Sequence, residues 1–375
     1  MKYLFIIQGE GRGHLTQAMT LERMLVAHGH QVIGMLVGKS PARRLPAFFT
    51  DGVKAPVHYF ESVNFVPSAK DKRPDPFRTF FRNVAVSFKF NKSIRMIARE
   101  IKTGGADVVI NFYELLGSIG YAWSHTKIPM VCIAHQFLLL HKDMHIGELG
   151  YEGHIGLNLF SRTIAAKATK VLALSFRKME DEPKLKMTVV PPLLRNSVVS
   201  LRRADGDSPL VRDDGYILGY MLNAGFAEEV NKWHAAHPEV PLHFFWDNAA
   251  EAPVKVVDET LSFYYLDDEE FVRQMASCHA YASTAGFESI CEAMYLGKPL
   301  MMVPSHIEQK CNAYDATKPV FADENGRKGH AAVASMKFDM SVLLDFAENR
   351  YVADPDFQSW VRSAEEIILR ELENF

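Results

Sequence analysis

Residues 281–313 read YASTAGFESICEAMYLGKPLMMVPSHIEQKCNA. The pattern predicts a strand, a turn of small residues, a helix, a tight turn at Gly297-Lys298-Pro299, an apolar strand and a second helix from about Glu308. A helix start presents unpaired N–H groups and the positive end of the helix dipole, which suits a phosphate. Ser289 adds a hydroxyl in the first turn, and Glu292 lies one turn further on the same face, where its carboxylate can accept hydrogen bonds from a ribose diol. The segment therefore predicts a combined phosphate and ribose site.

The same segment resembles the nucleotide-sugar signature of GT-B glycosyltransferases, the group that holds the UDP-glycosyltransferases and the bacterial enzyme that completes lipid II. The matching positions are Gly286, Phe287, Ser289, Glu292-Ala293, Gly297-Lys298-Pro299, Pro304, Glu308-Gln309 and Asn312-Ala313. The resemblance implies that the turn at Thr284, Gly286 and Phe287 and the hydroxyl of Ser289 hold the donor diphosphate. It further implies that Glu292 holds the ribose and that Glu308 and Gln309 bind the donor sugar. Thr284 stands where the plant enzymes carry histidine, and Glu288 stands where they carry asparagine.

The fold expected from this resemblance is α/β: two Rossmann-like parallel-sheet domains facing across a cleft, with a C-terminal helix that crosses back to the first domain. The 375 residues agree with two domains, because single cores stop growing near 250–300 residues. We expect an N-terminal, acceptor-side domain over 1–199, a polar linker over 200–214, a nucleotide-sugar domain over 215–350, and a crossover segment with a terminal helix over 351–375. The four cysteines show no CxxC spacing and predict buried free thiols in a reducing, cytoplasmic setting.

The formal charge of −3 hides an asymmetry between the two halves. Residues 1–199 carry 27 Lys and Arg against 15 Asp and Glu, a formal charge of +12, and the remainder of the chain carries −15. A basic first half suits an anionic partner or surface. Nucleic acid is not the expected partner, because the overall charge is not basic and no nucleic-acid motif is present.

The apolar run Lys2–Ile7 leads into a glycine loop, Gly9-Glu10-Gly11-Arg12-Gly13-His14, and then into a helical pattern. This is not the dinucleotide fingerprint, because His14 takes the place of the third glycine. In GT-B enzymes a glycine loop ending in Gly-His faces the donor, so the resemblance implies that Gly11, Arg12 and Gly13 line the cleft. An uncharacterised prokaryotic branch of the group shares this loop but has arginine where this chain has Gln17.

His14 is the candidate catalytic residue, as the group that receives or orders the proton of the acceptor hydroxyl. An imidazole has an ordinary pKa near the pH of catalysis, which suits a general base. The alternative is a histidine at a helix start that bonds only locally.

Three further strand ends carry polar residues. Glu114 and His135 each follow an apolar strand, and ligands of parallel sheets meet the carboxyl ends of strands, so both are candidate acceptor contacts. Loop capping is the alternative for both. Asn223 follows the first strand of the second domain and is a candidate phosphate contact. No metal is expected, because the Asp205-Gly-Asp207 triplet lies in the linker rather than after a strand.

Residues 70–102 mix five phenylalanines with ten cations. Exposed phenylalanines beside cations suit a membrane interface or a lipid-linked anionic acceptor, which would place the protein peripherally on the inner face of the membrane. The alternative, which we favour, is an amphipathic helix from about Phe77 to Ile101 whose apolar face packs on the core.

These observations predict an inverting, metal-independent glycosyltransferase that moves a sugar from a UDP-sugar to an acceptor hydroxyl on a glycan, lipid or small molecule, a lipid-linked or cell-envelope glycan being one candidate. No cofactor is expected beyond the UDP-sugar substrate. Two alternatives stay open: a UDP-sugar 2-epimerase, which would act without an acceptor, and a non-catalytic nucleotide-sugar sensor.

Overall fold

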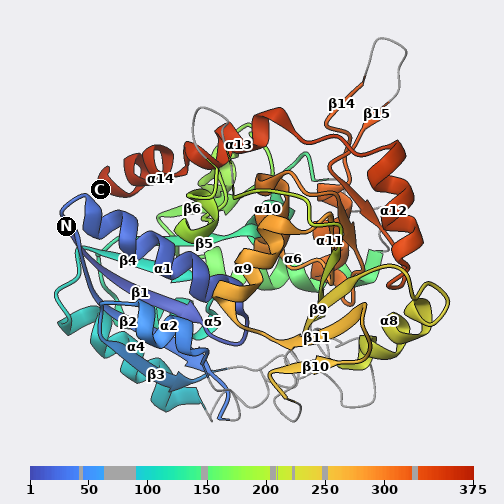
Figure 1. Ribbon diagram of the computed structural model, residues 1–375. Coiled ribbons are helices and arrows are strands. Elements are labelled where there is room, and N and C mark those ends of the chain that lie inside the picture. The colour runs from blue at the N-terminus through green and yellow to red at the C-terminus, as the bar shows by residue number, and fades with distance from the viewer. Residues whose placement is uncertain are drawn as a thin grey trace. The chain divides into compact units, whose positions relative to one another are not determined.

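The computed structural model describes residues 1–41, 45–62, 90–144, 151–202, 208, 210–221, 224–246, 252–322 and 328–375. The chain forms two compact units, which are described separately (Figure 1). Unit 1 comprises Met1–Arg195 together with Trp360–Phe375, and unit 2 comprises Asn196–Ser359.

Unit 1 is built on one parallel sheet. Its strands are β1 (Lys2–Gln8), β2 (Gln31–Lys39), β3 (Val57–Glu61), β4 (Val108–Phe112), β5 (Met130–Ala134), β6 (Lys170–Leu174) and β7 (Met187–Val190). Its helices are α1 (Arg12–Ala27), α2 (Ala47–Gly52), α4 (Asn91–Thr103), α5 (Leu115–Ser124), α6 (Tyr151–Ala165) and α14 (Ala364–Glu373), with 3-10 turns η2 (His135–Leu140) and η4 (Pro183–Leu185). The strand order is β3-β2-β1-β4-β5-β6-β7, so the direction of winding reverses between β1 and β4. Ligands of doubly wound sheets bind beside the carboxyl ends of strands at such a reversal.

Unit 2 repeats this plan. Its strands are β8 (Ile217–Met221), β9 (Leu242–Trp246), β10 (Val254–Val256), β11 (Leu261–Tyr265), β12 (Ala280–Ser283), β13 (Leu300–Met302), β14 (Phe321–Ala322), β15 (Lys328–Gly329) and β16 (Ala332–Ala334). Its helices are α7 (Asn196–Val199), α8 (Ala227–His234), α9 (Asp268–Ser277), α10 (Phe287–Leu296), α11 (Ile307–Ala316) and α12 (Met340–Asn349), with the 3-10 turn η5 (Ala224–Phe226). The main sheet has the order β10-β11-β9-β8-β12-β13-β16 and is parallel except for the edge strand β10. The winding reverses between β8 and β12.

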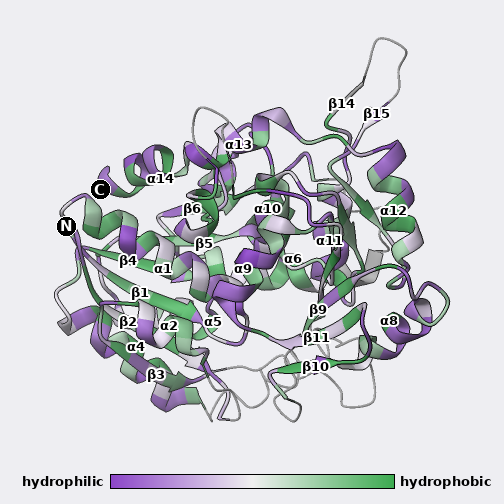
Figure 2. Ribbon diagram, viewed as in Figure 1, coloured by the Kyte–Doolittle hydropathy of each residue, from purple (hydrophilic) through white to green (hydrophobic). Residues whose placement is uncertain are grey.

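The central strands are apolar on both faces, as the predicted fold requires. Every residue of β4, β5 and β12 is buried, and β4 and β5 appear green among helices of mixed colour in Figure 2. Helices cover both faces of such a parallel sheet, so both faces of its central strands are buried. The sequences of these strands are therefore nearly continuous apolar runs. The two-domain α/β prediction is confirmed.

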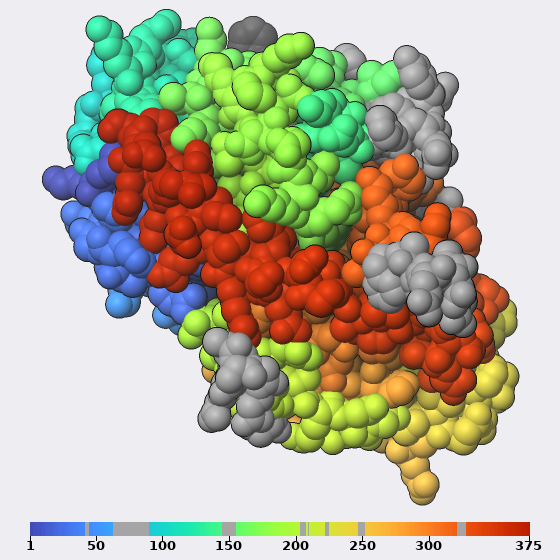
Figure 3. Space-filling model, turned by 90° about the horizontal axis from the view of Figure 1, so that it is seen from above, coloured from blue at the N-terminus to red at the C-terminus, as the bar shows by residue number. Residues whose placement is uncertain are grey.

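The chain returns to unit 1 through α13 (Pro355–Arg362) and ends in α14. Trp360 Nε1 donates to Ser175 O at 3.0 Å, Tyr3 Oη donates to Leu372 O at 3.2 Å, and Lys170 pairs with Glu371 at 2.8 Å. In Figure 3 the terminal segment, in red, lies along the blue and green surface of unit 1.

The apolar pattern over about 357–372 predicts one terminal helix, but the structure divides this stretch into α13 and α14. Ser363 separates α13 from α14, because its N–H bonds three residues back to Trp360 O at 3.2 Å and its hydroxyl donates to the same oxygen at 2.7 Å. This tight turn breaks the regular helical hydrogen-bond pattern at Ser363.

The basic and aromatic stretch over 70–102 lies largely outside the described residues, which resume at Phe90. In the described part, α4 buries Ile94, Ile97 and Ile101 against the unit and exposes Lys92, Arg95, Arg99 and Lys102. The described part of this stretch is therefore an ordinary amphipathic helix. Within the described residues, no helix has both the length and the apolar character needed to span a membrane.

All four cysteines are buried free thiols, as predicted. Burial raises the pKa of Cys278 and of Cys311 to about 12, which keeps both thiols protonated.

Candidate functional site

The turn between β12 and α10 lies at the strand reversal of unit 2. Ala285 adopts a left-handed conformation with φ of 61°. Gly286 is the N cap of α10, and no side chain caps the helix. Its φ of −71° does not require glycine, and a Cβ atom there would lie 3.9 Å from its nearest neighbour, Ser289 Oγ. Neither backbone conformation nor packing explains this glycine, which leaves the first N–H groups of α10 open to a ligand.

The small hydroxyl side chains around this turn lie close together. Ser289 Oγ donates to Gly286 O at 3.3 Å and lies 3.5 Å from Ser283 Oγ. Thr284 is fully buried, and its hydroxyl has no hydrogen-bond partner among the described residues. The structure thus brings Thr284, Gly286 and Ser289 together, and Phe287 begins the helix with 8% exposure.

The acidic and amide candidates differ in accessibility. Glu292 is fully buried in α10, so a ribose reaches its carboxylate only if covering side chains move. Gln309 is 5% exposed, and its Oε1 accepts from Ser305 N and Ser305 Oγ, both at 2.8 Å. Glu308 is partly exposed in the first turn of α11, and Glu288 is partly exposed in the first turn of α10, where the helix dipole favours a carboxylate.

The remaining unit 2 prediction cannot be placed. Asn223 lies outside the described residues, which resume at Ala224 in η5. Trp246, at the end of β9, is 4% exposed and stacks on Phe263, with 4.5 Å between the ring centres. Its side chain therefore packs in the core of unit 2.

In unit 1 the glycine loop follows the carboxyl end of β1, one of the two strands between which the winding reverses, and leads into α1. Gly11 is the N cap of α1 and has no side-chain cap, and a Cβ atom there would lie 3.9 Å from Gln8 Oε1, an ordinary contact. Arg12 follows, with its guanidinium 4.7 Å from the ring centre of Phe48, and then Gly13. His14 is partly exposed in the first turn of α1.

His14 has two defined neighbours. Its Nδ1 lies 3.2 Å from Gln17 Oε1, and its ring stacks on Tyr113 with 5.8 Å between the ring centres. When Nδ1–H donates to the amide oxygen, Nε2 carries the lone pair and can accept a proton. The amide of Gln17 thus lies beside His14 Nδ1, where a carboxylate would stand in a histidine–carboxylate pair.

Tyr113, which the sequence did not point to, contacts the candidate base His14. It follows β4 with φ of 56°, a strained conformation for a tyrosine, and its hydroxyl lies 2.6 Å from Ser161 Oγ. Its ring is held by Phe137 and Phe160 as well as by His14. Its position directly after a buried strand and next to Glu114 could have identified it as a candidate from the sequence.

Glu114 is the N cap of α5 and is 1% exposed. Its Oε1 accepts from Leu116 N at 3.0 Å and from Ser62 Oγ at 2.7 Å. Burial raises the pKa of this carboxyl to about 7, against the opposing effect of the two hydrogen bonds and with a smaller contribution from the charge of Glu10. A Cβ atom on Gly38 would press on Glu114 Oε2, so this glycine makes room for the carboxyl group.

His135 begins η2 at the end of β5 and is 2% exposed. Its Nδ1 donates to Leu174 O at 2.7 Å, which ties the end of β5 to the end of β6. Both acceptor candidates therefore have structural hydrogen bonds, and an acceptor contact by either stays a prediction.

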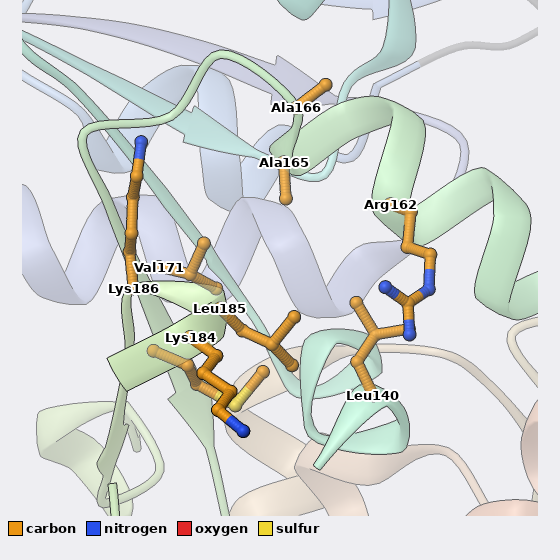
Figure 4. A pocket seen from close by; sticks show the side chains of 9 residues that line it. Leu140, Arg162, Ala165, Ala166, Val171, Lys184, Leu185 and Lys186 are labelled. Atoms are coloured by element: carbon orange, nitrogen blue, oxygen red, sulfur yellow. The ribbon is translucent and has the colours of Figure 1, made fainter. Parts of the chain in front are cut away.

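Unit 1 also has a surface pocket with a volume of about 220 Å³ (Figure 4). It is lined by Leu140, Arg162, Ala165, Ala166, Val171, Lys184, Leu185, Lys186 and Met187. Val171 and Met187 lie at the amino ends of β6 and β7, whereas His14, Glu114 and His135 follow carboxyl ends. The pocket contains none of the predicted site residues.

Comparison with known proteins identifies the fold and the family. The model of glycosyl transferase family 1 matches residues 1–324. No curated protein sequence matches the chain.

Solved structures of glycosyltransferases resemble the chain over nearly its whole length. The glycotransferase of kitacinnamycin has a TM-score of 0.61 at 15% identity, with 99% of this chain and 98% of that chain covered. MurG of Acinetobacter baumannii has a TM-score of 0.60 at 17% identity, with both chains fully covered. UGT89C1 of Arabidopsis thaliana, in complex with UDP-L-rhamnose, has a TM-score of 0.59 at 13% identity, with 100% and 95% covered. At these identities the likeness shows the GT-B fold, and the family match supplies the activity. The chain belongs to glycosyl transferase family 1 and is a glycosyltransferase.

Proposed function

We propose that this enzyme transfers a sugar from a UDP-sugar to an acceptor hydroxyl with inversion at the anomeric carbon and without a metal ion. The observation that carries the proposal is the open start of α10 at the strand reversal of unit 2, where Gly286 leaves the helix without a side-chain cap. A diphosphate leaving group needs charge stabilisation, and N–H groups at a helix start supply it without a cation.

In the proposed reaction, the acceptor oxygen forms a bond to the anomeric carbon while the bond from that carbon to the diphosphate oxygen breaks. The electron pair of the broken bond leaves with UDP. His14 Nε2 accepts the proton of the acceptor hydroxyl, because Nδ1 is engaged by Gln17. A single displacement of this kind inverts the anomeric centre.

Donor recognition is assigned to side chains of unit 2. Thr284, Phe287 and Ser289 surround the diphosphate, with Asn223 as a further contact. The carboxylate of Glu292 holds the ribose, and Glu308 and Gln309 bind hydroxyls of the sugar. UGT89C1 binds UDP-L-rhamnose with a similar fold, which supports a uridine nucleotide as the donor.

Acceptor recognition is assigned to unit 1, with Gly11, Arg12 and Gly13 beside His14 and with Glu114 and His135 as further contacts. The formal charge of +12 over residues 1–199 suits an anionic acceptor, such as a lipid-linked or cell-envelope glycan. Cosedimentation of the protein with anionic and neutral vesicles tests the accompanying proposal of a peripheral membrane contact through residues 70–102. Equal recovery with both vesicles would contradict it.

A panel of nucleotide sugars, screened by thermal shift, tests the donor. A specific donor raises the unfolding temperature by mass action, and a UDP-sugar should raise it more than the same sugar on another nucleotide. The stabilising donor is then incubated with and without acceptor candidates. Release of an epimerised or free sugar without acceptor would indicate an epimerase instead.

The His14→Ala variant should lose transfer by at least 100-fold while it keeps the affinity for UDP. His28→Ala, at the other end of the same helix, is the control and should transfer normally. Near-normal transfer by His14→Ala would disprove the base assignment.

Gln17→Ala tests the orientation of His14. Removal of the amide oxygen frees Nδ1, so we expect a lower kcat and an altered pH profile with little change in KM for the donor. An unchanged pH profile would show that Gln17 does not act through His14.

Glu292→Ala should weaken UDP binding by about tenfold, since it removes charge-assisted hydrogen bonds to the ribose. Glu348→Ala, on the exposed face of α12, is the control. Calorimetry measures both affinities, and an unchanged Kd for Glu292→Ala would remove Glu292 from the site.

A further inference from the structure

The turn that begins α10 is held from a distance by one side chain. Asn312 Nδ2 donates to Ala285 O at 3.0 Å, across 27 positions of sequence, and Asn312 is 1% exposed. Ala285 is fully buried and has the left-handed φ of 61°. A non-glycine residue adopts this conformation only when its surroundings impose it.

The helix that carries Asn312 is itself fixed beside this turn. Gln309, one turn earlier on α11, accepts two hydrogen bonds from Ser305. At the other end of the turn, Val303 N donates to Ser283 O at 2.7 Å and so ties β13 to the end of β12. Asn312 therefore contacts the turn from an anchored helix.

We propose that Asn312 is a positioning residue for donor binding. Its hydrogen bond holds Ala285 in the left-handed conformation and thereby aims the first N–H groups of α10 at the donor diphosphate. This inference rests on the proposed function for the identity of the ligand, but the hold on the turn is a property of the protein alone.

The physical argument compares two states of the turn. In the left-handed state Ala285 is strained by its Cβ atom, and the hydrogen bond from Asn312 offsets that strain. Without the amide, Ala285 relaxes toward an ordinary conformation, which rotates the following peptide groups. A glycine at position 285 has no Cβ and adopts the left-handed state without strain. Glycine should therefore rescue the loss of the amide.

The experiment uses UDP as the probe and calorimetry on four proteins: wild type, Asn312→Ala, Ala285→Gly and the double variant. We expect Asn312→Ala to weaken the Kd by about tenfold, because a buried carbonyl loses its partner and the strain is released. Ala285→Gly should bind nearly as wild type, and the double variant should recover to within about threefold of wild type. Asn349→Ala, which removes an exposed amide bonded within α12, is the matched control.

A second measurement does not depend on the ligand. Hydrogen exchange of the amides at 286–290 should be faster in Asn312→Ala and should return toward the wild-type rate in the double variant. Equal exchange in wild type and Asn312→Ala would overturn the inference, as would a double variant that binds UDP as weakly as the single one. If wild type does not bind UDP, the proposed donor fails, and the exchange rates still decide whether Asn312 holds the turn.

Discussion

Replacement of Glu114 by glutamine should remove a pH dependence of the stability of unit 1. The carboxyl group has an ordinary pKa of 4.5, and burial raises the pKa to about 7 in the folded protein. Below pH 4.5 the group is protonated in both states. Between pH 4.5 and 7 the unfolded chain releases the proton while the folded protein keeps it, so the free energy of unfolding falls as the pH rises. Above pH 7 both states are ionised, and the effect stops growing.

The size of the effect follows from the same two values. At about 1.4 kcal/mol for each pH unit, the interval from 4.5 to about 7 corresponds to about 3 kcal/mol. The 1% exposure of Glu114 leaves little screening by solvent. Glutamine keeps an oxygen that can accept from Leu116 N and Ser62 Oγ but does not titrate, so Glu114→Gln should gain about 3 kcal/mol relative to wild type between pH 4.5 and 8.

The measurement is urea unfolding of both proteins at pH 4.5, 5.5, 6.5 and 8. Pulsed hydrogen exchange of peptides from β4, labelled at one fixed pH, reports the unfolding of unit 1. The contributions of other titrating groups to the free energy of unfolding cancel in the difference between the two proteins. Ser62→Ala is the second test, because loss of a donor to the ionised carboxylate raises the pKa of Glu114 further and extends the falling range above pH 7. A constant difference between Glu114→Gln and wild type across this range would refute the reasoning.

Three further predictions concern packing and anchoring. Lys298→Met should destabilise unit 2 by about 3 kcal/mol in urea unfolding, because the buried ammonium donates to two backbone carbonyls, at 2.6 and 2.7 Å, which would lose their partner. Gly219→Ala should cost about 2 kcal/mol in the same assay, since the new methyl group would overlap the buried ring of Phe244, and an unchanged midpoint would show that the ring can move aside. Trp360→Phe should lower the free energy of unfolding by about 1 kcal/mol, because it loses the hydrogen bond to Ser175 O. Hydrogen exchange in α14 should become faster, and exchange at the wild-type rate would contradict an anchoring role.

Much of the fold could be predicted from local sequence. The sequence predicts strands over 170–174 and 187–190 and a helix over 268–277, and β6, β7 and α9 have these bounds, because each is a short periodic run between clear breakers. The break at Ser363 was not predicted, since a serine inside an apolar periodic pattern does not reveal whether its hydroxyl bonds back to the helix.

The candidate site was predicted unevenly. Thr284, Gly286 and Ser289 are adjacent in sequence, so their proximity follows from one turn of chain. The neighbours of His14 include Tyr113, which comes from another strand end, and no local pattern links the two positions. The burial of Glu292 was also not predicted, because burial of one helix face depends on what packs against it.

The sequence by itself indicated alternating strands and helices and a small-residue turn at the start of the helix that follows Ser283, and the resemblance to GT-B glycosyltransferases added the two Rossmann-like domains. Hydrophobic periodicity and turn chemistry act over a few residues, and a single sequence displays them. Only the tertiary structure decided that Glu114 is buried beneath Gly38, that Tyr113 stacks on His14, and that Asn312 holds the strained Ala285. Those states depend on contacts between residues 27 to 99 positions apart, which come together only when the chain folds.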